Sequence, residues 1–193
     1  MFSFSGLLVY AVVTAYTPGP NTILSLRHAA ERGLSGSFPF HFGMLGGMSL
    51  IMLGCAACGG LLAAAAPGWE PVLRAVGAGY MAWLAWTLIR SPASGSDRTS
   101  GRATFLSGAL LQFVNPKIYI YGVTALSAYV LPHFRHPAAL AGFALFLALV
   151  GFSGTVCWAV CGSTLRRVLD RHARTVNVVA ALLLLGCAAS LYV

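Results

Sequence analysis

Apolar runs long enough to cross a lipid bilayer recur along the whole chain, and they restrict its fold more than any other feature. A hydrocarbon core of about 30 Å requires about 20 helical residues. Runs of this order occupy residues 2–26, 42–64, 72–89, 104–130, 138–162 and 176–193. Only 8% of the residues are charged, whereas a soluble domain has about 25%. The sequence therefore predicts an all-α membrane protein with six transmembrane helices, surrounded by the lipid bilayer.

The net charge of +8 comes almost entirely from arginines between the apolar runs. Nucleic-acid-binding proteins gather such charges on one face or stripe, so this distribution favours a topology signal and no nucleic-acid partner. The first, third and fifth connectors contain Arg27, Arg32, Arg90, Arg98, Arg102, Arg166, Arg167, Arg171 and Arg174, and the other two contain Arg74 and Arg135. The positive-inside rule then places the odd connectors in the cytoplasm and both termini outside.

The N-terminal segment MFSFSGLLVYAVV lacks a positively charged start and a small-residue cleavage pattern. We therefore expect it to be the first membrane span rather than a secretory signal. A polar stretch then divides the single transmembrane domain, 1–193, into two blocks of three spans. We expect a first three-helix repeat at 1–90, a cytoplasmic linker at 91–103 and a second repeat at 104–193. Because three is odd, the second block would be inverted relative to the first.

Proline interrupts the opening span of each block, in TPGPN at 17–21 and in VNPK at 114–117. Paired interruptions in corresponding spans are typical of inverted-repeat transporters, and they predict broken first and fourth helices. Two independent kinks that only serve packing are the alternative. Proline frees the carbonyl four residues before it. The carbonyls concerned are those of Thr14, Tyr16 and Gln112.

Lys117 is the only lysine of the chain and lies about midway along its span. A charge at that depth costs at least about 2.5–3.5 kcal/mol, and no span interior contains a carboxylate to offset it. The acidic residues are Glu31, Glu70, Asp97 and Asp170, all in connectors. Three explanations stay open: freed carbonyls and water solvate the ammonium, the amine is neutral, or a ligand supplies the anion.

The two breaks also offer groups that recognise a small zwitterion. Half-helices that restart near Asn21 and Lys117 would present free N–H groups to an anion, and Asn115 is a favoured cap. Freed carbonyls suit an ammonium, so an amino acid is the expected substrate. Gln112 is a candidate cavity-lining amide. Tyr16 and Tyr119 would face an ammonium or simply pack, and Tyr121 is expected to pack.

These motifs resemble the LysE/RhtB family of bacterial amino-acid exporters over the whole chain. The segments LQFVNPKIYIYGVTALSAYVLP, CWAVCG, AGYMAWLAW and NVVAALLLLGCAASLYV are similar to members that export cysteine and O-acetylserine. The resemblance implies export of small neutral amino acids across the inner (plasma) membrane by proton antiport. The site residues implied by position are Pro18, Gly19, Pro20, Asn21, Asn115, Pro116 and Lys117, to which the residue chemistry adds Gln112 and Tyr119.

Two other functions compete with export. One is a membrane thiol–disulfide electron carrier that would use Cys55 with Cys58 and Cys157 with Cys161. The cysteines lie in apolar surroundings without nearby cations, which favours inert packing. The other is a passive small-solute channel, which would dissipate a gradient rather than build one. GMLGG at 43–47 fits close helix packing, and the oligomeric state stays open.

The titratable side chains indicate no cofactor and no metal site. The histidines are scattered along the chain at His28, His41, His133, His136 and His172. His41 would lie at the mouth of the second span, as an interfacial anchor or as a proton relay. If transport is coupled to protons, Lys117, His41 and the substrate amine all stay candidates for the proton carrier.

Overall fold

The computed structural model describes residues 2–90, 103–165 and 171–189, and every regular element in these ranges is helical. The elements are α1 (Phe4–Tyr16), α2 (Pro20–Arg90), α3 (Phe105–Val114), α4 (Pro116–Ala125), the π-helix η1 (Leu126–Val130), α5 (Pro137–Thr164) and α7 (Ala173–Ala189). The predicted all-α class is therefore confirmed. The predicted linker at 91–103 lies outside the described residues except for Ala103.

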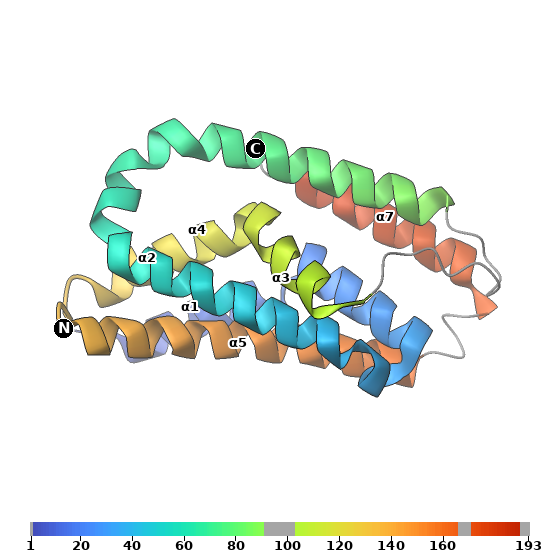
Figure 1. Ribbon diagram of the computed structural model, residues 1–193, viewed down its shortest axis with the longest axis horizontal. Coiled ribbons are helices and arrows are strands. Elements are labelled where there is room, and N and C mark those ends of the chain that lie inside the picture. Colours follow the sequence, from blue (N-terminus) through green and yellow to red (C-terminus); the bar gives the residue numbers. More distant parts are fainter. Residues whose placement is uncertain (1, 91–102, 166–170, 190–193) are drawn as a thin grey trace.

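Helix α2 is one element of 71 residues that passes through two of the predicted connectors. Only Gly33 leaves helical geometry, with φ 76° and ψ 168°, a conformation open almost only to glycine. Figure 1 shows the chain bending back after the middle of α2, so that the later part runs beside α7. Proline bends a helix, and Pro67 and Pro71 are in this region. The connector predicted at 65–71 is thus helical, although the chain changes direction along this part of α2. The division into a second and a third span stays a prediction.

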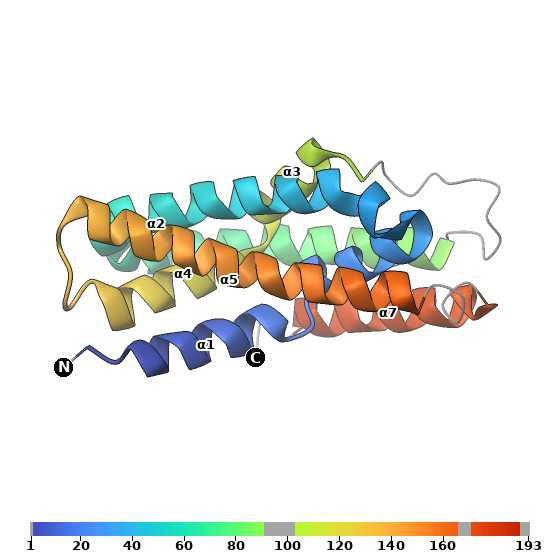
Figure 2. The same ribbon diagram turned by 90° about the horizontal axis from the view of Figure 1, so that it is seen from below.

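Helix α5 runs alongside the middle part of α2 in both ribbon views (Figures 1 and 2). On another side, α2 packs closely against α3 through glycine. A Cβ atom on Gly108 would collide with the Phe40 carbonyl, and one on Gly43 would collide with the Phe105 carbonyl. The two backbones thus touch without intervening side chains, as small residues allow in membrane helices. GMLGG is accordingly an internal packing motif in this chain.

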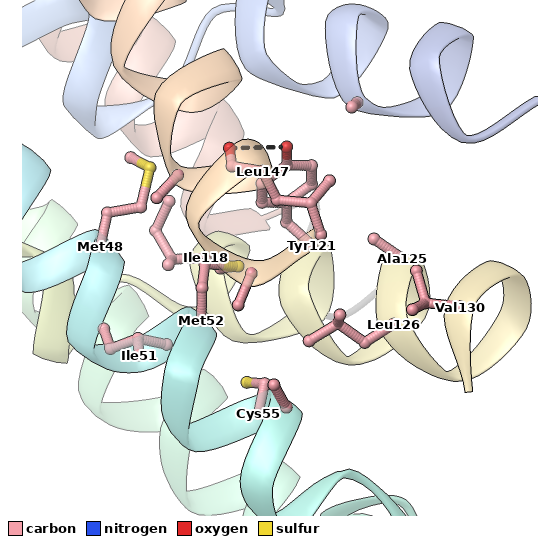
Figure 3. Close-up of a cluster of buried hydrophobic side chains, with 14 of the residues drawn as sticks. Met48, Ile51, Met52, Cys55, Ile118, Tyr121, Ala125, Leu126, Val130 and Leu147 are labelled. Atoms are coloured by element: carbon pink, nitrogen blue, oxygen red, sulfur yellow. Dashed lines mark hydrogen bonds between the residues drawn. The ribbon is translucent and has the colours of Figure 1, made fainter. Parts of the chain in front are cut away.

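The larger core cluster joins α1, α2, α4, η1 and α5. Met48 and Met52 of α2 are almost fully buried there against Ile118 and Tyr121 of α4 (Figure 3). The Tyr121 hydroxyl donates a hydrogen bond of 3.0 Å to the Leu147 carbonyl of α5. This bond satisfies the polar atom of a buried tyrosine, in agreement with the predicted packing role.

Two helical stretches are by themselves long and apolar enough to cross a membrane. They are Pro20–Cys58, with mean hydropathy 1.5, and Pro137–Thr164, with mean hydropathy 2.1. Shorter apolar helices lie at Phe4–Tyr16, Phe105–Val114 and Arg174–Ala189. Large apolar side chains on several helices are also exposed, for example Val9, Leu50, Leu106 and Leu182, each more than 60%. Acyl chains would cover such a surface. The six-span topology stays a prediction.

Candidate functional site

The first break separates α1 from α2 at the TPGPN motif. Helix α1 ends at Tyr16 and α2 begins at Pro20, as predicted for a broken first helix. Thr17 and Pro18 are exposed, whereas Gly19 and the residues after it are buried. The Thr22 hydroxyl accepts a hydrogen bond of 2.8 Å from the Gly19 N–H and donates one of 3.0 Å to the Gly19 carbonyl. This local pairing holds the start of α2.

The second break separates α3 from α4 at a single residue, Asn115. Its side-chain oxygen accepts a hydrogen bond of 3.1 Å from the Lys117 N–H, and Pro116 occupies the first turn of α4. Proline is well suited to that position because its missing N–H would have no helical partner there. The Asn115 N–H donates to the Gln112 carbonyl at 3.2 Å. The predicted cap and the predicted fourth-helix break are both present.

Three buried amide side chains connect the two breaks. Asn21 Nδ2 donates to Gln112 Oε1 at 2.8 Å, and Asn115 Nδ2 donates to Asn21 Oδ1 at 3.0 Å. Gln112 Nε2 donates to Asn21 Oδ1 at 3.3 Å and to the Gly108 carbonyl at 3.1 Å. All three side chains are at most 7% exposed. Their polar atoms are largely satisfied by hydrogen bonds to one another. This amide triad of Asn21, Gln112 and Asn115 therefore connects the first break to the second.

Lys117 reaches across from the second break to the first. Its Nζ donates a hydrogen bond of 2.9 Å to the Thr17 carbonyl. A Cβ atom on Gly19 would lie only 3.3 Å from that Nζ, so the absence of a side chain at Gly19 lets the lysine lie there. Within the described ranges the one ion pair joins Arg27 and Glu31, and no carboxylate pairs with Lys117. The ammonium is thus solvated by a backbone carbonyl at the end of α1, that of Thr17, which is not one of the three carbonyls predicted to be freed by proline.

A cavity of about 30 Å³ lies between the two breaks and α5. Of the residues predicted to bind substrate, Gly19, Asn21, Asn115 and Lys117 line it. The rest of its wall consists of Thr14, Ala15, Thr22, Met48, Ile118, Tyr121, Gly151 and Thr155. The cavity residues of α5, Gly151 and Thr155, could not be predicted from the sequence, because α5 contains neither a charged residue nor an internal proline. This volume has room for roughly two water molecules.

The other predicted site residues lie beside this cavity rather than on its wall. Pro20 and Pro116 are buried in the two breaks, Gln112 belongs to the amide triad and Pro18 is exposed. The Tyr119 hydroxyl donates to the Phe113 carbonyl at 3.2 Å, which anchors the tyrosine to the end of α3.

Helices α5 and α7 also contribute side chains to the first break. Trp158 Nε1 donates to the Tyr16 carbonyl at 3.1 Å, and the Tyr16 hydroxyl is 3.2 Å from the Ser153 hydroxyl. The freed Tyr16 carbonyl therefore has a partner from α5. Cys187 of α7 has its Sγ 3.9 Å from the Pro18 carbonyl. Sequence reasoning missed Trp158 and Cys187.

A protein-family model described as "LysE type translocator" matches residues 12–193. The chain belongs to the LysE family. It is also 39% identical over 188 residues to proteins named cysteine/O-acetylserine efflux protein from Escherichia coli K12, Escherichia coli O157:H7 and Shigella flexneri serotype 5b. Each alignment covers 97% of this chain and 96% of the relative. No solved structure matches the chain. The predicted resemblance is confirmed, and this LysE translocator is a membrane transporter rather than an enzyme.

The cysteines of the LysE translocator are all free thiols. Cys55 is 2% exposed, and its Sγ would lie 3.2 Å from a Cβ atom on Gly122 of α4. Cys58, Cys157 and Cys161 are exposed on the helix surfaces. Cys55 is thus part of the α2–α4 contact, which is a packing role. Among the described residues no cluster of three or more His, Cys, Asp or Glu could hold a metal ion.

A second buried polar group lies on α2 of this LysE translocator, apart from the cavity. His41 is 1% exposed, and its Nδ1 is 2.7 Å from the Ser37 carbonyl. Its Nε2 has no hydrogen-bond partner among the described residues, and the same holds for His28 Nδ1 and Arg32 Nε. The His28 ring packs edge-on against Phe40, with 4.6 Å between the ring centroids. His41 is therefore enclosed, rather than an anchor at an exposed span mouth.

Proposed function

We propose that this LysE translocator exports small neutral amino acids of the cysteine and O-acetylserine type from the cytoplasm across the bacterial inner membrane. The observation that carries the proposal is the placement of Lys117. Its ammonium has a backbone carbonyl as partner and no carboxylate within the described ranges, and it lies at a cavity lined by two amides. A zwitterion supplies the anion that this arrangement lacks. The names of the relatives support the same substrate class.

The proposal includes a six-span, three-plus-three inverted repeat with both termini outside. Helix α1 with the start of α2 would form the broken first span, and α3 with α4 and η1 would form the broken fourth. The contacts between the breaks support this pairing, because discontinuous helices of two repeats meet at the substrate site of such transporters. A cavity with room for roughly two waters must widen before an amino acid fits. Movement of the two repeats would provide that space.

Coupling to protons is the second part of the proposal, with Lys117 and His41 as the candidate carriers. His41 Nδ1 faces a carbonyl and therefore carries a hydrogen, which leaves Nε2 as a buried acceptor for a proton. On α2, His28 is close to His41, and Arg27, Glu31 and Arg32 lie near His28. Helix α3, which packs on this part of α2, contains no charged or titratable residue.

The test is transport into reconstituted liposomes with an imposed pH difference and a panel of labelled amino acids. We expect cysteine and O-acetylserine to accumulate above their external concentration, and the pH difference to set the direction of accumulation. A channel would only equilibrate them. Lys117→Met should lose transport, whereas a variant with all five cysteines replaced by Ser or Ala should keep it. Normal transport by Lys117→Met would refute the proposed site, and loss in the cysteine-free variant would support the thiol carrier.

A further inference from the structure

We propose that the Thr17 carbonyl is the binding group for the ammonium of the substrate, and that Lys117 occupies it as an internal substitute for that ammonium. When an amino acid binds, its ammonium takes the Thr17 carbonyl, and Lys117 turns to the carboxylate of the same molecule. This inference rests on the proposed export of amino acids. It goes further by naming the acceptor, the group that leaves it and the order of the exchange.

The first step is that the Thr17 carbonyl is available to a cation. Thr17 follows the last residue of α1 and has extended backbone geometry, with φ −63° and ψ 135°. Its carbonyl is therefore outside the helical hydrogen-bond ladder and accepts from Lys117 Nζ at 2.9 Å. The neighbouring carbonyls are engaged differently. Tyr16 accepts from the Trp158 indole, and Pro18 faces the Cys187 thiol.

The second step is that the group on the Thr17 carbonyl can leave it. Lys117 holds the contact through a flexible four-carbon stem, whereas the Trp158 indole is a rigid ring packed from α5. A Cβ atom on Gly19 would lie 3.4 Å from Lys117 Cδ and 3.3 Å from its Nζ. The stem therefore passes directly over Gly19, and no side chain there blocks its movement. Gly19 and Lys117 also line the same cavity, so the ammonium adjoins the space where a substrate would enter.

The third step is the match in chemistry between the group that leaves and the group that arrives. Both are ammonium groups, so the carbonyl exchanges one positive donor for an equivalent one. The displaced lysine would be left half-buried without a partner, and such a charge is costly in a membrane. A carboxylate on the same ligand removes that cost. The site would consequently favour a molecule that has both groups over a simple amine or a simple acid.

This two-group requirement can be measured with three related ligands. Cysteine has both groups, cysteamine lacks the carboxylate and 3-mercaptopropionate lacks the ammonium. Binding to the purified full-length protein would be measured by displacement of labelled cysteine, or directly by calorimetry. The variants are Lys117→Met, which keeps a stem of similar length without charge, and Arg135→Met, which removes an exposed cation outside the site.

We expect wild type and Arg135→Met to bind cysteine far better than either analogue. In Lys117→Met, cysteine should bind about 10- to 100-fold more weakly because a charge-assisted contact is lost. Cysteamine should bind at least as well as to wild type, because the competing ammonium is gone. Equal weakening of both ligands would overturn the inference and leave Lys117 as a fixed structural contact. If wild type binds no amino acid at all, the proposed function fails together with the inference.

A second measurement needs no substitution. Because Lys117 is the only lysine, reductive methylation with a ¹³C label gives one lysine resonance besides that of the N-terminus. Saturating cysteine should shift this resonance, and 3-mercaptopropionate alone should leave it in place. An unshifted lysine resonance in protein that has bound cysteine would contradict the exchange.

Discussion

Truncation of Asn21 tests whether the amide triad holds the two breaks together. In Asn21→Ala, Gln112 Oε1 and Asn115 Nδ2 would lose the partners that they now have at 2.8 and 3.0 Å. Each orphaned buried polar group costs about 1–3 kcal/mol, so the expected loss of stability is about 2–6 kcal/mol. For a chain of 193 residues, each kcal/mol lowers the Tm by about 2–4 °C, which gives a decrease of at least about 4 °C.

The assay is thermal unfolding of the purified protein in one detergent, with Asn177→Ala as the matched control. Asn177 is a half-buried asparagine of α7 that lies outside the triad. The double variant with Gln112→Leu should lose less than the sum of the single losses, with a coupling of about 0.5–3 kcal/mol. Equal Tm shifts in Asn21→Ala and Asn177→Ala, or strict additivity in the double variant, would refute the triad as a connection between the breaks.

Three further substitutions test other contacts. Gly108→Ala should destabilise the fold by about 1–3 kcal/mol, because the added methyl group would collide with the Phe40 backbone. The control Gly142→Ala has open space around its Cβ position and should be neutral or stabilising in the same unfolding assay. Trp158→Phe should cost about 1–3 kcal/mol by leaving the Tyr16 carbonyl unpaired, and a Tm unchanged from wild type would show that this hydrogen bond contributes nothing. His41→Gln should abolish the acceleration of transport by a pH difference but leave exchange without a gradient intact. Gradient-driven transport at the wild-type rate in liposomes would remove His41 as the proton carrier.

The features that could be predicted from the sequence are those set within one helical turn. Proline acts on the carbonyl four residues before it, so both breaks and the Asn115 cap follow from local spacing. The lack of a carboxylate partner for Lys117 within the described ranges was expected, because the sequence places all four acidic residues in connectors. In each case the physical cause lies in the motif itself or in the composition.

The features that could not be predicted depend on how helices face one another. Trp158 pairs with Tyr16 across 142 residues, and Asn21 pairs with Gln112 across 91. In a soluble protein an apolar stripe would indicate the buried face, but these helices are apolar on all sides. Their rotation is therefore not encoded in periodicity. For the same reason α5, which forms one wall of the cavity, has no signal that marks it.

The contact between α2 and α3 restricts how the proposed repeats can move. In the proposed architecture these helices would belong to different repeats. Their backbones nevertheless touch at Gly43 and Gly108, and an opening there would expose carbonyls and leave a void. We therefore expect α3 to stay with the neighbouring part of α2 during transport, and the movement to arise at the Asn115 break, where α3 and α4 are joined by one residue. Gly46→Cys with Phe105→Cys, linked by a short thiol reagent in a cysteine-free background, should retain transport. If the link stops transport while each single variant stays active, the helices must separate and the hinge lies elsewhere.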